Sequence, residues 1–149
     1  MDFEKSIDRL NKLLRGELSA TETYHMAIEK VKEPDYLRVL RDNLQSHERK
    51  VTKLRDYIVR LGGQPAESSG VWGAWSKLFM GGAKVFGEDA AIAALEEGED
   101  QGLRDYRETI NVSDLETDFL HFVNTDLLPE QERTHRALSV LKERGRAPV

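Results

Sequence analysis

The chain has 149 residues, a net charge of −5, no cysteine, and 33% charged residues beside 39% hydrophobic ones. This length suits one domain with a hydrophobic core. The absence of cysteine excludes disulfides, thiolate metal sites, iron–sulfur clusters and thiol nucleophiles. The mixed, mildly acidic charge excludes a nucleic-acid partner. No uncharged apolar run approaches the roughly 18 residues that cross a membrane, and the acidic start is no secretory leader, so we expect a cytoplasmic protein with no membrane partner.

Two long helices are predicted in the first part of the chain. Between Phe3 and Lys32 apolar residues recur at intervals of three and four, which is the period of one helix face. The spacing resumes after Pro34, which fits the first turn of a helix. It stops at Gly62, since glycine readily takes the left-handed conformation that ends helices. We therefore predict a helical hairpin over residues 3–62.

A different composition follows in residues 63–87. Glycine, proline and serine flank Trp72 and Trp75, so we predict a long crossover that contains a short helix. The helical period returns over residues 88–145 and gives a second hairpin, in which Pro129 is expected to bend the last helix. Because a crossover of this length can span a helix, the third helix is predicted to run parallel to the second.

The second hairpin repeats the first. "GELSATETY" at Gly16–Tyr24 corresponds to "GEDQGLRDY" at Gly98–Tyr106, and "ERKVTKLRDYI" from Glu48 aligns without gaps on "ERTHRALSVLK" from Glu132. The repeated tyrosines are expected to pack in the core. Four long helices in two related hairpins predict an all-α four-helix bundle with internal pseudo-twofold symmetry. We interpret residues 1–149 as this single domain.

Acidic residues interrupt the apolar faces of the predicted helices. Glu17 and Glu99 occupy equivalent places in the two repeats. A carboxylate inside a bundle costs several kcal/mol unless it is protonated, hydrogen-bonded or bound to a cation. With Glu48 and Glu132 the bundle would hold four glutamates, whose charge two divalent ions would neutralise. The spacing Glu132-x-x-His135 adds an imidazole on the same helical face.

These residues resemble the ligand set of the ferritin-like superfamily, in which two helices each supply a glutamate and two each supply Glu-x-x-His. The duplicated hairpins and the crossover look like an uncharacterised bacterial ferritin-like family, related to rubrerythrins, over about residues 5–143. The resemblance implies a dinuclear carboxylate site and, for rubrerythrin-like relatives, iron and peroxide or oxygen chemistry. Val51 stands in place of the second-helix histidine, and His47 replaces it only if the helix is locally rewound. A single-metal site, or an ancestral site now empty, fits these facts too.

Two functions follow as alternatives. The first is binding of one or two ions of iron, manganese or zinc, with iron-related or oxidative-stress activity. The ligands expected for it are Glu17, Glu48, Glu99, Glu132, His135 and His47. The second is a metal-free structural or stress-associated bundle that acts through protein contacts of residues 72–86 and the charged outer faces, with a homodimer as the candidate assembly. No pairing of nucleophile and base points to a hydrolase, and whether the chain is an enzyme stays open.

Overall fold

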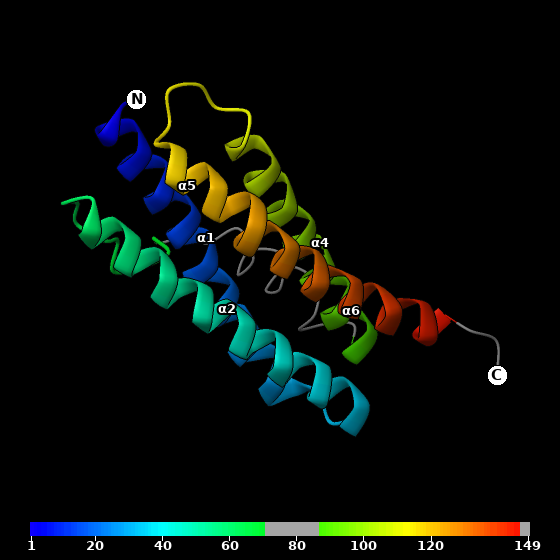
Figure 1. Cartoon of the computed structure of the whole chain (residues 1–149). Helices are drawn as coiled ribbons and strands as arrows, with labels where there is room; N and C mark the ends of the chain where they lie inside the picture. Colours follow the sequence, from blue (N-terminus) through cyan, green and yellow to red (C-terminus); the bar gives the residue numbers. More distant parts are fainter. Residues whose placement is uncertain (71–86, 147–149) are drawn as a thin grey trace.

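The computed structural model describes residues 1–70 and 87–146, which form helices joined by turns, without a strand among them (Figure 1). In chain order the helices are α1 (Phe3–Lys30), α2 (Pro34–Arg60), α4 (Glu88–Thr109), α5 (Thr117–Phe122), the π-helical segment η1 (Val123–Leu127) and α6 (Leu128–Arg146). The predicted all-α fold of two hairpins is confirmed. The short helix predicted in the crossover, with Trp72 and Trp75, lies outside the described residues. None of the described helices is long and apolar enough to cross a membrane.

Local interactions set the ends of the first hairpin's helices. Asp2 caps α1, because its carboxylate accepts a hydrogen bond from a backbone N–H of the first turn at 3.0 Å. Pro34 lies in the first turn of α2, where its missing N–H costs nothing. After α2, Gly62 has a φ of +85°, and the N–H of Gly63 returns to the carbonyl of Ile58 at 2.9 Å. This glycine turn ends α2 where the sequence predicts it.

The fourth helix of the bundle is one rod made of α5, η1 and α6 (Figure 1). Pro129 has no N–H, and its ring would collide with a carbonyl one turn earlier in a regular α-helix. The chain widens just before it, because the N–H of Leu128 donates to the carbonyl of Val123, five residues back. The bend predicted at Pro129 is therefore a π-helical turn that ends just before the proline.

The two hairpins lie side by side with their first helices antiparallel. α1 packs along α2, α4 packs along α6, and the hairpins meet mainly through α1 and α4 (Figure 1). Arg9, near the start of α1, donates to Thr109 at the end of α4 at 2.8 Å. Lys32, just after α1, donates its backbone N–H to Glu88 at the start of α4. Since α2 is also antiparallel to α1, α4 runs parallel to α2, as predicted.

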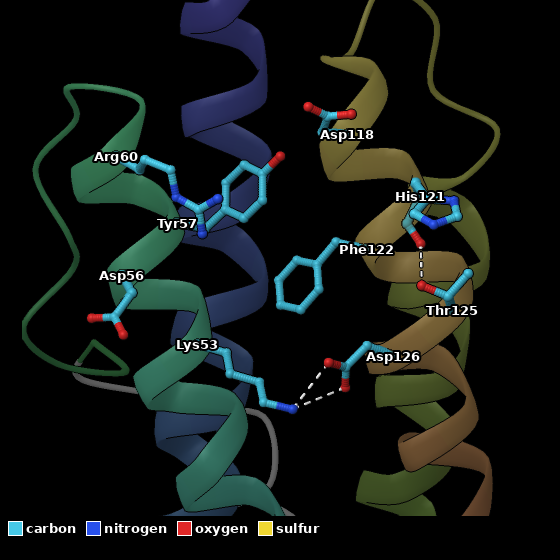
Figure 2. A pocket seen from close by; sticks show the side chains of 9 residues that line it. All are labelled: Lys53, Asp56, Tyr57, Arg60, Asp118, His121, Phe122, Thr125 and Asp126. Atoms are coloured by element: carbon cyan, nitrogen blue, oxygen red, sulfur yellow. Dashed lines mark hydrogen bonds and ion pairs between the residues drawn. The ribbon is translucent and has the colours of Figure 1, made fainter.

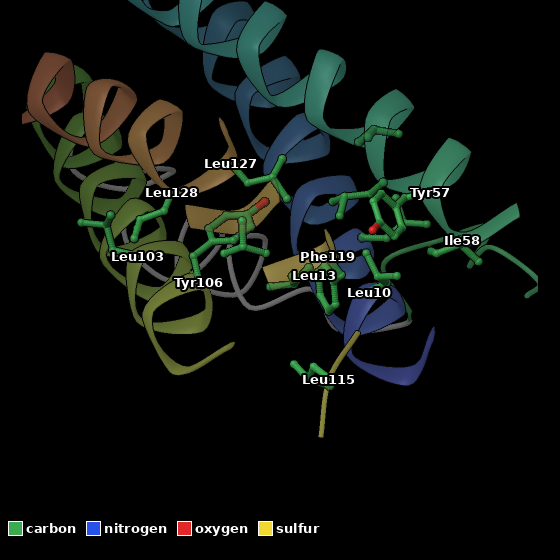
Figure 3. Packing of buried hydrophobic residues seen from close by; sticks show 14 residues of the cluster. Leu10, Leu13, Tyr57, Ile58, Leu103, Tyr106, Leu115, Phe119, Leu127 and Leu128 are labelled. Atoms are coloured by element: carbon green, nitrogen blue, oxygen red, sulfur yellow. The ribbon is translucent and has the colours of Figure 1, made fainter. Parts of the chain in front are cut away.

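The core consists of two apolar clusters separated by a polar layer. One cluster, which includes Leu10, Tyr57 and Phe119, surrounds the first half of α1 (Figure 3). The other, which includes Tyr24 and Leu95, surrounds its second half. The polar layer crosses the bundle between these clusters, with residues from α1, α2, α4 and α6. It consists of Glu17, His47, Lys50, Glu99, Gln131 and Thr134. Apolar packing on both sides keeps this layer away from water.

Candidate functional site

His47 is the centre of the polar layer and links the glutamates of the two repeats. Its Nδ1 lies 2.6 Å from Oε2 of Glu17, and its Nε2 lies 2.6 Å from Oε1 of Glu99. The three residues are at most 4% exposed. Ionised carboxylates only accept hydrogen bonds, so with both glutamates ionised we infer that both ring nitrogens donate and that His47 is an imidazolium. Burial lowers the pKa of a histidine, but the carboxylates of Glu17 and Glu99 outweigh it and raise the pKa of His47 above its usual value.

Lys50 supplies the second positive charge of the layer. Its Nζ lies 2.9 Å from Oε1 of Glu17 and also donates to the amide oxygen of Gln131. The same nitrogen stands 5.2 Å from the centre of the Tyr106 ring. Burial alone would raise the pKa of Glu17, but the charges of Lys50 and His47 more than offset it and lower this pKa to about 2. Two carboxylates thus face two cations, and the layer as a whole is neutral.

The tyrosine of each repeat binds the glutamate of the other repeat. The Tyr24 hydroxyl donates to Oε1 of Glu99 at 2.8 Å, and the Tyr106 hydroxyl donates to Oε1 of Glu17 at 2.7 Å. Burial and the carboxylate that each tyrosine faces raise the pKa of both hydroxyls well above the ordinary value for tyrosine. Both hydroxyls therefore stay protonated and act as donors. The repeated Gly-Glu-x6-Tyr pattern therefore encodes two crossed hydrogen bonds, and these tyrosines do more than pack.

Gln131 and Thr134 of α6 complete the surroundings of Glu99. Its Oε2 accepts from Nε2 of Gln131 at 2.8 Å and from the Thr134 hydroxyl at 2.7 Å. Asn43 of α2 ties this group to the tyrosine, since its Nδ2 donates to the Tyr24 hydroxyl at 3.0 Å and to the Thr134 carbonyl at 3.1 Å. Each oxygen of both buried carboxylates therefore has a donor, which is what makes their burial affordable.

The inward-facing pairs of α2 and α6 differ by one residue from the predicted ligand pairs. The structure turns His47 and Lys50 inward from α2, and Gln131 and Thr134 inward from α6. Within each pair the two residues are three apart, so they share a helix face. A residue one place further along lies about 100° around the helix. This rotation takes Glu48 away from the centre.

Three of the six predicted ligands meet in the layer, and three do not. Those that meet are Glu17, His47 and Glu99. Glu48 is exposed and lines a shallow groove between α1 and α2. Glu132 is half-buried. His135 is 23% exposed and bonds the carboxylate of Asp100, away from the layer.

A dinuclear carboxylate centre does not fit the layer as its side chains are arranged. Glu17 and Glu99 bind opposite nitrogens of one imidazole ring, so their oxygens face the ring from two sides instead of a common point. The ammonium of Lys50 lies against Glu17 and would repel a divalent ion there. Among the described residues no three His, Asp or Glu side chains are grouped in a way that could hold a metal ion.

Two glycines beside the layer lead to opposite predictions for stability. A Cβ added at Gly102 would lie 2.4 Å from Nε2 of Gln131, which is held by the Glu99 carboxylate. A Cβ added at Gly16 would meet nothing within 4 Å. We expect Gly102→Ala to destabilise the fold by about 1–3 kcal/mol, because Gln131 must leave its partners. Gly16→Ala is expected to stabilise it by about 0.5–1 kcal/mol through helix propensity.

Urea unfolding of the wild type and the two alanine variants measures these changes. Equal shifts for Gly16→Ala and Gly102→Ala would contradict the position assigned to Gln131.

A separate groove of about 530 Å³ lies on the surface between α2 and the α5–η1 segment (Figure 2). Tyr57 and Phe122 point toward each other across it with stacked rings, 5.4 Å between centres. The guanidinium of Arg60 lies 4.8 Å from the Tyr57 ring centre. Lys53 and Asp126 join the two walls through an ion pair of 3.0 Å. The groove thus has an aromatic floor and a charged rim.

Solved structures with the same fold were found by comparison. One, titled a ferritin-like, diiron-carboxylate protein from Bacillus anthracis str. Ames, has a TM-score of 0.75 and 16% identity, over 95% of this chain and 99% of that one. Another, a dodecameric thioferritin described as the bacterioferritin-related protein from Bacteroides fragilis, has a TM-score of 0.79 and 18% identity, over 98% of this chain and 89% of that one. These likenesses show the ferritin-like fold.

The sequence itself matches no curated protein. It does match one protein family, which is described as a domain of unknown function, DUF2383, and the match covers residues 5–112. This range is well over half of the 149 residues and includes α1 from its third residue on, all of α2 and all of α4. The chain therefore belongs to the DUF2383 family of proteins of unknown function, and it has the ferritin-like fold.

Proposed function

We propose that this chain is a metal-independent bundle of the ferritin-like fold that acts through protein contacts. The observation that supports this proposal most is the internal neutralisation of the buried carboxylates. Lys50 and the imidazolium of His47 already provide the positive charge that Glu17 and Glu99 require. Two buried carboxylates without counter-charge would need a bound cation, but a neutral, hydrogen-bonded layer does not.

A thermal-unfolding titration tests the metal-independent state. Protein purified without a tag is expected to melt within about 1 °C of the same temperature in chelator and in an excess of Fe(II), Mn(II) or Zn(II), because a ligand that does not bind the native state cannot stabilise it. Elemental analysis of the same preparation is expected to find less than about one metal ion for every ten chains. A stoichiometric metal content, or a rise of several degrees, would contradict the proposal.

Metal binding is the second candidate function. The solved neighbours support it, since one is titled a diiron-carboxylate protein and the other a bacterioferritin-related protein. Of the predicted ligands, Glu17, His47 and Glu99 meet in the layer, but as they are arranged they do not converge on one ion. Their use as ligands requires the imidazole to lose a proton and Lys50 to move away from Glu17. The titration above decides between the two candidates.

For the protein contacts we propose the groove between α2 and α5–η1 as the binding surface and a basic segment of a partner protein as its occupant. Both cations of the groove are already engaged, Lys53 with Asp126 and Arg60 with the Tyr57 ring. Within the described part of the chain, by contrast, Asp56 and Asp118 on the rim form no ion pair. An arginine or lysine side chain laid on the aromatic floor would be paired by these carboxylates.

Fluorescence anisotropy with a labelled peptide that carries several arginines tests this surface. We expect Asp56→Asn combined with Asp118→Asn to weaken binding roughly tenfold, as two partly exposed charge pairs are lost. Glu48→Gln is the matched control, because Glu48 is an exposed carboxylate of the same helix outside the groove. Equal weakening in the control would mean that only the overall negative charge attracts the peptide, and the groove would be rejected.

A further inference from the structure

Lys50 lies where a ferritin-like bundle would present a metal ligand. In such bundles two helices each turn a Glu-x-x-His pair inward. Here the corresponding inward pairs are His47-x-x-Lys50 and Gln131-x-x-Thr134. On the inward face of α2, Lys50 therefore stands where that pattern has its histidine, although the repeat alignment puts Val51 there, and its side chain carries a positive charge into the core.

The surroundings of the Lys50 ammonium are those of a bound cation. Nζ lies 2.9 Å from a carboxylate oxygen of Glu17 and also contacts the amide oxygen of Gln131. The face of the Tyr106 ring is 5.2 Å away. Carboxylate and amide oxygens are also the ligands that hard divalent ions such as Mn²⁺ and Mg²⁺ prefer. A cavity of about 20 Å³ beside Glu17, lined in part by Gly16 and Tyr106, has room for about one water molecule.

We propose that Lys50 is the residue that excludes metal from this bundle, and that removing both its charge and its volume creates a site for a hard divalent cation at the place of its Nζ. The inference rests on the proposed metal-independent function of the wild type. The ligands of this divalent cation would be the side-chain oxygens of Glu17 and Gln131, together with water in the space that the lysine side chain leaves.

The charge balance of the layer explains the exclusion. Two carboxylates already face two cations, Lys50 and His47, so a divalent ion added to the intact layer would leave two uncompensated positive charges in a dry interior. Without the ammonium the layer carries one excess negative charge, so a divalent ion is attracted to it and leaves one uncompensated positive charge instead of two. Loss of charge is therefore necessary for metal binding, but the ion also needs the space.

Two substitutions at one position separate charge from space. Lys50→Ala removes the charge and opens room, whereas Lys50→Met removes the same charge but fills the room with an unbranched side chain of similar length. Each variant and the wild type are melted with about 1 mM Mn(II) or with chelator. We expect Lys50→Ala to gain about 5 °C or more with Mn(II), and Lys50→Met and the wild type to change by less than about 1 °C. Adding Glu17→Gln to Lys50→Ala is expected to abolish the gain.

If Lys50→Ala is unfolded in chelator, the measurement becomes the helical circular dichroism recovered on adding Mn(II). If Mn(II) stabilises neither Lys50→Ala nor the wild type, the role of Lys50 is overturned, but the proposed metal-independent function still holds. An equal response of Lys50→Met overturns the requirement for space and with it the assigned position. A wild type that itself gains stability overturns both proposals, because Lys50 would then exclude nothing.

Discussion

Replacing Lys50 by methionine is expected to lower the free energy of unfolding by about 3–5 kcal/mol, the usual cost of removing one partner of a buried ion pair. The loss arises because Glu17, at 4% exposure, keeps its charge but loses the ammonium 2.9 Å away. The amide oxygen of Gln131 loses its donor as well. Urea unfolding monitored by circular dichroism measures the change.

Lys53→Met is the control for this prediction. Lys53 lies one turn further along α2 and pairs with Asp126 at 3.0 Å, but it is 45% exposed, so its loss should cost no more than about 1 kcal/mol. In a double-mutant cycle, Glu17→Gln should cost much less in the Lys50→Met background than alone, since the uncompensated charge is then gone. Similar losses for Lys50→Met and Lys53→Met would contradict the ion-pair account.

The stability of the fold is expected to be highest between about pH 4.5 and pH 6.5 and to fall on both sides. The pKa of Glu17 is lowered from 4.5 to about 2 in the folded protein, so its contribution is present above pH 4.5 and is lost as the pH falls toward 2. A depression of this size corresponds to roughly 3 kcal/mol. The pKa of His47 is raised from 6.5, so its contribution is complete below pH 6.5 and is lost as the pH rises through the folded-state pKa.

Urea midpoints measured across this pH range test both sides of the profile. Glu17→Gln should flatten the acid side. Glu130→Gln should flatten it less, although the pKa of Glu130 is also lowered to about 2, because its hydrogen-bond partner Arg133 is 44% exposed and water screens the pair. An acid side that is unchanged in Glu17→Gln would show that Glu17 is not held ionised by the layer.

Much of the fold could be predicted because helix periodicity and helix ends are local properties of the sequence. Pro34 and Gly62 mark real helix boundaries, and the parallel course of α2 and α4 follows from the length of the crossover. The π-helical turn before Pro129 could not be placed, since the chain can relieve a proline by bending or by widening, and packing decides which of the two occurs.

The glutamates of the layer were predictable, but their partners were not. Glu17 and Glu99 stand out because a repeat places an acid twice on an apolar face. Their crossed tyrosines were underestimated, because distances along one helix do not show which residue of another helix lies opposite. The repeated Gly-Glu-x6-Tyr spacing was the available clue.

The positive charge of the layer was missed for a related reason. Lys50 shares a helix face with His47, but a lysine in a charged helix ordinarily lies in solvent, so its sequence position alone did not mark it as buried. The repeat alignment pairs Glu48 with Glu132, whereas the helical period favours His47 and Gln131, one place earlier, as the inward residues. Tertiary packing resolves a difference of one residue that an alignment of two repeats leaves undecided.

The protonation state of His47 tests the central claim most directly, because the account requires positive charge from the protein itself at the middle of the bundle. Nitrogen-15 chemical shifts of the imidazole, recorded on histidine-labelled protein in chelator at neutral pH, report whether each ring nitrogen carries a proton. We predict that both do, since each donates to a carboxylate oxygen at 2.6 Å. A neutral ring with one bare nitrogen would contradict the account, because the two glutamates would then lack the counter-charge assigned to them.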